Sequence, residues 1–137
     1  MVKRLVLFTL LVTLLCCFVF VHAEEKEETA LPLGFIRITS STQQGWLPLP
    51  LTEEYDYPFV QVLADGTQVR NVIRLMPDGF YMESSDCDNQ NCVEEGVVTL
   101  ENRDSRVLYN AVFCLPHQVC IELFSLEEVL QMMGASL

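Results

Sequence analysis

The sequence predicts a mainly β protein: a small barrel or sandwich-like domain with one short C-terminal helix, preceded by a signal peptide. Turn signals recur about every 8–12 residues between runs of alternating apolar and polar residues, which is typical of small all-β domains. The last segment changes to a helical period. At the other end, an uncharged apolar run follows two basic residues, as it does in secretory signals.

Residues 1–23 have the three parts of a signal peptide. Lys3 and Arg4 form the basic start, an apolar run follows, and small residues stand where a signal peptidase would read them before a cut after Ala23. We therefore expect a secreted or extracytoplasmic protein. The apolar run also approaches the ~20 residues of a membrane span, so a protein anchored in the membrane by residues 5–23 is the alternative.

The rest of the chain is strongly acidic. The full sequence has 8 Lys and Arg against 19 Asp and Glu, and a net charge of −11. Cleavage removes two basic residues and no acidic one, so the net charge becomes −13. Binding to nucleic acid needs a basic surface that displaces phosphate counterions. We expect no nucleic-acid partner, and contact with a membrane only through an uncleaved N-terminal segment.

One domain follows the signal peptide. Residues 24–32 begin with the charge run EEKEET and are predicted to be a flexible acidic spacer. Residues 33–137 suffice for one domain with a modest core. Its first strand is GFIRIT (34–39), in which Phe35 and Arg37 alternate with Ile36 and Ile38. The proline-rich segment 46–58 is predicted to be a loop or a sheet edge, because proline cannot donate to a strand ladder.

Two turn signals organise the middle of the domain. Asp65-Gly66 divides residues 59–75 into a strand–turn–strand hairpin. The turn Pro77-Asp78-Gly79 precedes a short strand at residues 80–83. The later strands are predicted at GVVTL (96–100), RVLYNAVFCL (106–115) and QVCIELF (118–124).

The C-terminal segment has the period of a helix. Ser125, followed three residues later by Glu128, fits a capping box. Apolar residues then recur at helical spacing until Gly134, which ends the helix. These residues are Leu126, Val129, Leu130 and Met133. We expect this stripe to pack on one end of the domain.

Four cysteines remain after cleavage, and they lie in the stretches SDCDNQNCVEEG (85–96) and VFCLPHQVCI (112–121). They are Cys87, Cys92, Cys114 and Cys120. In a small exported domain such cysteines are candidates for disulfides. We expect the first stretch to be a polar turn, with Asp86 as its cap and Gly96 at its end, and Pro116 to lie in a turn of the second stretch.

The favoured disulfide pairs are the two local ones, Cys87–Cys92 and Cys114–Cys120. Residues 87–92 favour a turn over a helix, and a three-residue hairpin loop at 116–118 would set Cys114 opposite Cys120. A rival pairing joins the turn at 87–92 to Cys114 and leaves Cys120 free or paired with the remaining cysteine. The separations of the Cα atoms distinguish the two pairings, because cysteines whose Cα atoms are more than ~7 Å apart cannot be bridged.

Other chemistry finds weaker support in the sequence. Zinc sites favour cysteines two to four residues apart in two knuckles, and the gaps here are wider, so we predict no metal site and no cofactor. A calcium loop starting at Asp86 fails because Asn91 stands where glycine is needed and Val97 where glutamate is needed. His117, the only histidine after the signal, is expected to be an exposed turn residue, and with no catalytic motif in the chain we expect no enzyme.

Two stretches carry a family resemblance. NVIRLMPDGFYMESSDCDNQNCVEEGVVTL (71–100) and NAVFCLPHQVCIEL (110–123) resemble the NusG domain II-like family, whose members are small β-rich domains, some of them stand-alone exported proteins of bacteria. The chain departs from the family pattern at Asp88, where proline is usual, and at Cys120, where an apolar residue is usual.

This resemblance and the signal peptide together imply an exported, non-enzymatic domain of the bacterial envelope. We expect it to act as a binding or accessory module for an unknown protein or envelope partner. Two alternatives stay open: a thiol-redox or electron-transfer accessory that uses the four cysteines, and a metal-binding module. A count of free thiols with and without reductant would separate these three functions.

Overall fold

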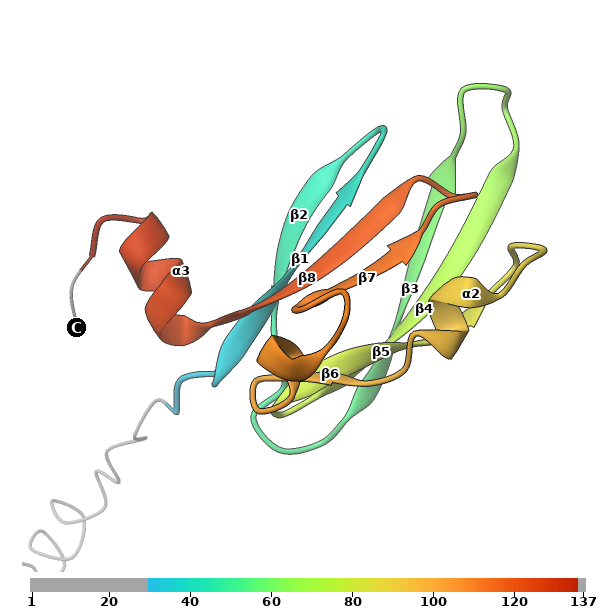
Figure 1. Cartoon of the computed structure of the whole chain (residues 1–137). Coiled ribbons are helices and arrows are strands. Elements are labelled where there is room, and N and C mark those ends of the chain that lie inside the picture. Colours follow the sequence, from blue (N-terminus) through green and yellow to red (C-terminus); the bar gives the residue numbers. More distant parts are fainter. Residues whose placement is uncertain (1–29, 136–137) are drawn as a thin grey trace, which may run out of the picture. The chain divides into compact units, whose positions relative to one another are not determined.

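The computed structural model describes residues 30–135, where eight strands form two four-stranded antiparallel sheets (Figure 1). The first sheet has the order β2-β1-β8-β7, with β1 at Gly34–Ser40, β2 at Gln44–Pro48, β7 at Ala111–Cys114 and β8 at Val119–Ser125. The second has the order β3-β4-β5-β6, with β3 at Tyr55–Val62, β4 at Gln68–Met76, β5 at Gly79–Ser85 and β6 at Val98–Thr99. The helical elements are α2 (Asn91–Glu94), the 3₁₀ turn η1 (Arg103–Ser105) and α3 (Leu126–Met132).

Side chains from both sheets form one core. In β1 and β8 every second residue is buried, and these residues join the inward side chains of β4 and β5 in a single cluster. The fully buried members with the largest side chains include Ile36, Ile73, Leu75, Phe80, Met82, Ile121 and Leu123. Burying each such side chain contributes about 1.5–3 kcal/mol. The predicted mainly β fold is confirmed as a sandwich, and the two sheets do not close into a barrel.

The first hairpins follow the sequence closely. The proline-rich segment 46–58 includes the end of β2 and the start of β3, and both of these are edge strands, where Pro48 and Pro58 need no partner. Between β3 and β4 the predicted turn forms: Gly66 has φ +86°, and the carboxylate of Asp65 accepts the backbone N–H of Thr67 at 2.9 Å.

Two predicted strands are shorter than expected. Of residues 96–100 only Val98 and Thr99 pair with β5. Of residues 106–115 only Ala111–Cys114 form a strand, because two turns fold the chain before it. In these turns the N–H of Tyr109 (φ +52°) donates to the Arg106 carbonyl and the N–H of Ala111 donates to the Leu108 carbonyl.

The predicted C-terminal helix is confirmed as α3. The hydroxyl of Ser125 accepts the N–H of Glu128 at 3.2 Å, and the Glu128 carboxylate accepts the N–H of Ser125 at 2.7 Å, so the capping box is complete. Leu126, Val129 and Leu130 are half-buried, whereas Met133 is exposed. Gly134 has φ +72° and ends the helix as predicted.

The predicted signal peptide (1–23) and residues 24–29 of the predicted spacer lie outside the described residues and stay predictions. Between residues 30 and 135 the structure contains no helix with the length and apolar character of a membrane span.

Candidate functional site

Three cysteines from two distant segments meet at one side of the sandwich. Cys87 follows β5, Cys92 lies in α2 and Cys114 ends β7. The sulfurs of Cys87 and Cys92 are 3.7 Å apart, and all three sulfurs lie within 4.8 Å of one another. All three residues are at most 5% exposed. We call these three residues the thiol cluster; it lies where the chain between β5 and α2 packs against β7 in the other sheet.

The polar residues around Cys87 build the turn that carries it. The Gln90 side chain donates to the carbonyls of Ser85 (2.9 Å) and Cys87. Asn89 accepts the backbone N–H of Asn91 at 3.3 Å and the thiol of Cys87 at 3.6 Å. The stretch is the polar turn that the sequence predicts, but it also contains α2, a single helical turn that the sequence analysis missed. This helical turn is what directs Cys92 into the core.

Of the three predicted turn residues, Pro116 lies in a turn and Gly96 at the end of one as expected, whereas Asp86 does not cap its turn. Gly96 has φ +75°, a left-handed conformation that suits glycine just after a helix end. Pro116 lies in the turn between β7 and β8, which the Gln118 N–H closes on the Leu115 carbonyl. Asp86 does not cap the turn at 85–96, because its carboxylate accepts the backbone N–H of Arg70 in β4 at 2.9 Å.

The predicted pairing of Cys114 with Cys120 is wrong. In the register of β7 and β8, Cys114 lies opposite Val119, and Phe113 lies opposite Cys120. The loop between the strands is one residue longer than predicted, and a shift of one residue moves a side chain to the other face of a sheet. Cys114 therefore faces the core, while Cys120 is half-buried on the outer face. The four cysteines within residues 30–135 are free thiols in the structure.

His117 is buried, so the prediction of an exposed turn residue is also wrong. Its side chain is 4% exposed, with Nδ1 2.9 Å from Oδ1 of Asn71 and Nε2 3.2 Å from the Asp86 carboxylate. Its carbonyl accepts a hydrogen bond from the side chain of Gln61. Asn71 and Gln61 are buried too, and buried polar groups need partners. Gln61 and Asn71 are polar residues within the apolar strands β3 and β4. They are the sequence signal for this buried network, and sequence reasoning overlooked it.

Ser85 joins this polar network to the thiol cluster. Its hydroxyl lies 3.4 Å from Nδ1 of His117 and 3.8 Å from the sulfur of Cys114, and it accepts the backbone N–H of Cys87 at 3.2 Å. Both ring nitrogens of His117 also face side-chain oxygens of Asn71 and Asp86. The imidazole is thus positioned as a structural partner of this network, and the hydroxyl of Ser85 stands between it and the thiols.

Burial controls the acidity of the thiols. It raises the pKa of Cys92 to about 12, with the neighbouring thiol of Cys114 as a further cause. Burial also acts to raise the pKa of Cys87, but hydrogen bonds with Ser85 and with the Gln90 backbone outweigh it and lower this pKa. On the outer face, burial and then the charge of Glu122 raise the pKa of Cys120 to about 11. Cys87 is thus more readily ionised than Cys92 or Cys120, and both of these are neutral at pH 7.

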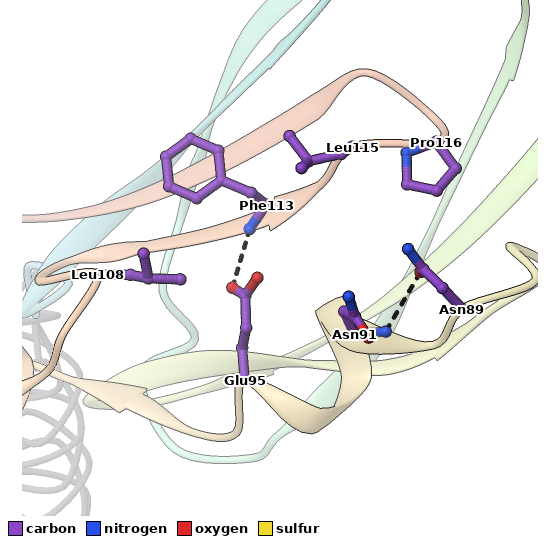
Figure 2. A pocket seen from close by; sticks show the side chains of 7 residues that line it. All are labelled: Asn89, Asn91, Glu95, Leu108, Phe113, Leu115 and Pro116. Carbon is purple, nitrogen blue, oxygen red and sulfur yellow. Dashed lines mark hydrogen bonds between the residues drawn. The ribbon is translucent and has the colours of Figure 1, made fainter.

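A groove lies between α2 and β7 (Figure 2). Its volume is about 270 Å³, and it is lined by Asn89, Asn91, Glu95, Leu108, Phe113, Leu115 and Pro116. The polar wall comes from the turn that carries Cys87 and from α2, and the apolar wall comes from β7 and the loops at its ends. We call this feature the α2–β7 groove.

Large apolar side chains are exposed along this groove. Leu115 is 77% exposed, and Phe113 and Leu108 are each 37% exposed. Val107 and Tyr109, in the turn before β7, are exposed as well. Solvent-exposed apolar side chains gathered around a hollow mark an interaction site more often than scattered ones do.

Glu95 is the charged group of the groove. Burial raises the pKa of its carboxyl, an effect opposed by the hydrogen bond from the Phe113 N–H at 2.9 Å and by the charge of Arg106. This hydrogen bond, drawn in Figure 2, occupies an edge N–H of β7. The N–H of Ala111 is bonded to Leu108, and its carbonyl accepts from Arg106, so this edge offers few groups to an added strand.

Comparisons with known proteins identify the fold alone. No family model matches the chain, and no curated protein sequence matches it. A crystal structure of a DUF1312 family protein (EF3258) from Enterococcus faecalis V583 has a TM-score of 0.50 at 16% identity, covering 68% of this chain and 98% of that one. A solution structure of the Lin0431 protein from Listeria innocua has a TM-score of 0.51 at 14% identity, covering 72% and 80%.

These comparisons correct the family predicted from the sequence. The Enterococcus neighbour is described as a DUF1312 family protein and not as NusG domain II-like, which points to a different family from the one suggested by the cysteine motifs. Both structural neighbours come from bacteria, and the fold is that of a DUF1312-like β domain, a description that assigns no function.

Proposed function

We propose that this protein is an exported, non-enzymatic binding module, and that it holds a partner protein in the α2–β7 groove. The observation that carries the proposal is the exposure of Phe113, Leu115 and Leu108 around one partly buried carboxylate, that of Glu95. Export is supported by the N-terminal sequence pattern over residues 1–23.

The size of the groove favours side chains over a cofactor. Its volume of about 270 Å³ lies just below the ~300–1,000 Å³ of typical ligand pockets. One or two apolar side chains of a partner fill such a space, as they do at the centre of many protein interfaces. Because Glu95 and Arg106 occupy the edge of β7, the partner is recognised through side chains and not as an added strand.

Charge defines the partner further. The chain has a net charge of −11, and the polar wall of the groove includes the carboxylate of Glu95. An apolar segment that also carries lysine or arginine would place its charge against Glu95 and would be attracted by the whole domain. We therefore propose an apolar, basic polypeptide segment as the ligand.

A titration followed by NMR tests this function. The probe is a ten-residue peptide of alternating leucine and lysine, and the control is the same peptide with glutamate in place of lysine. The first peptide should shift the amide signals of Phe113, Leu115 and Glu95, and the second should not. A Phe113→Ser variant should lose the shifts, whereas Val60→Ser, which removes an apolar side chain of similar exposure (42%) on β3, should keep them. Equal shifts with both peptides, or shifts away from the groove, would refute the proposal.

A further inference from the structure

We propose that the thiol cluster is a metal site, in which Cys87, Cys92 and Cys114 bind one Zn²⁺ ion as thiolates. The spacing of the cysteines hides this site, because the ligands do not form two local knuckles. The fold instead brings a pair from the β5–α2 connection together with the last residue of β7. The site is independent of the groove and of what binds there.

The sulfur positions suit a shared ion. Two sulfurs bound to the same tetrahedral zinc at ~2.3 Å lie about 3.8 Å apart. The sulfurs of Cys87 and Cys92 are 3.7 Å apart, which fits that value, whereas a disulfide needs ~2.05 Å. Since all three sulfurs lie within 4.8 Å of one another, Cys114 needs to approach by no more than about 1 Å.

Hydrogen-bond donors lie beside two of the three sulfurs. Three thiolates and one Zn²⁺ carry one net negative charge, and buried charge needs hydrogen-bond donors. The hydroxyl of Ser85 is 3.8 Å from the sulfur of Cys114, and the side-chain amide of Gln90 is 3.9 Å from that of Cys87. Ser85 is itself fixed by the side chains of Asn71 (3.1 Å) and His117 (3.4 Å), as outer residues of metal sites commonly are.

Three ligands leave one position on the ion open. Within residues 30–135 the cluster gathers three possible metal-binding side chains, and the register of β7 and β8 keeps Cys120 on the other face of the sheet. Zinc sites with three protein ligands take a water molecule or another small ligand in the fourth position. The alternative is a Cys87–Cys92 disulfide, which would use two of the sulfurs and leave Cys114 as an apolar residue of the core.

The decisive experiment measures zinc in the full chain, purified under reducing conditions and incubated with Zn²⁺ alone before unbound ion is removed. Wild type should retain about one equivalent per chain, and Co²⁺ in its place should give a thiolate-to-cobalt charge-transfer absorption. Cys92→Ser and Cys114→Ser should each retain less than about a tenth as much, while Cys120→Ser, which removes a thiol outside the cluster, should match wild type.

Zinc retention by wild type tests the proposal even where a cluster variant fails to fold. Retention of less than about 0.1 equivalent of zinc by folded, reduced wild type would overturn the proposal. Equal zinc retention by folded Cys92→Ser and Cys120→Ser would overturn the assignment of the ligands. A mass-spectrometric map showing Cys87 and Cys92 fully linked, in protein that was exported and kept from reductant and that holds no zinc, would establish the disulfide instead.

Discussion

Replacing His117 by alanine tests whether the buried polar network holds the two sheets together. The imidazole hydrogen-bonds Asn71, which is fully buried, and faces Asp86, whose side chain is 54% exposed. Leaving the Asn71 oxygen without a donor costs about 1–3 kcal/mol, and the lost contact with an exposed carboxylate adds at most about 1 kcal/mol. With the space left by the ring, we expect a loss of about 2–4 kcal/mol in the free energy of unfolding.

Urea denaturation of wild type and His117→Ala measures this loss directly, with the slope m as a check that both unfold in the same way. The midpoint of thermal unfolding should fall by at least about 8 °C. In a double-mutant cycle, His117→Ala should cost about 1 kcal/mol less in the Asn71→Ala background than in wild type, because the oxygen that it would leave without a donor is already gone. A loss below about 0.5 kcal/mol, as is usual for an exposed turn residue, would refute the reasoning.

Three further predictions concern the rest of the chain. A Cβ at Gly79 would clash with the Val98 carbonyl oxygen, so Gly79→Ala should lower the free energy of unfolding, measured in urea, by about 1–3 kcal/mol. A Cβ at Gly45 would have no atom within 4 Å, so Gly45→Ala should leave the stability unchanged. Equal effects of the two substitutions would contradict this. Burial acts to raise the pKa of Glu128, but hydrogen bonds with Arg103 and Ser125 outweigh it and lower the pKa, so the folded state should lose stability as the pH falls through this lowered pKa. Glu128→Gln should flatten that acid limb of a plot of stability against pH, and an unchanged limb would contradict the assignment. N-terminal sequencing of exported material should begin at Glu24, and an intact Met1 in the membrane fraction would establish the anchor.

The sequence predicts the local parts of the fold because local patterns determine them. The alternation in β1 and β8, the Asp65-Gly66 turn and the capping box of α3 each depend on residues close in the chain. Turns formed by Arg106 and Tyr109 interrupt the apolar segment before β7, and the apolar pattern does not show them. The period of the apolar residues and the turn residues therefore suffice to predict most strands, but not the turns that precede β7.

The candidate site depends on contacts between distant residues, which is why the sequence predicted it less well. One extra residue in the loop 115–118 sets the register of β7 and β8, and this register separates Cys114 from Cys120. The same loop buries His117 against Asn71, a partner on another sheet. Spacing rules for zinc compare neighbours in the chain, so they do not detect a third ligand that the fold supplies.

The affinity of the leucine–lysine peptide for the groove tests the proposed function most directly. Isothermal titration calorimetry at low and at physiological salt should give a dissociation constant at least about tenfold larger for Phe113→Ser than for wild type. Glu95→Gln should weaken binding more at low salt than at physiological salt, because salt screens the charge pair. Val60→Ser should bind as wild type does. Equal affinities for Phe113→Ser and Val60→Ser would contradict the account.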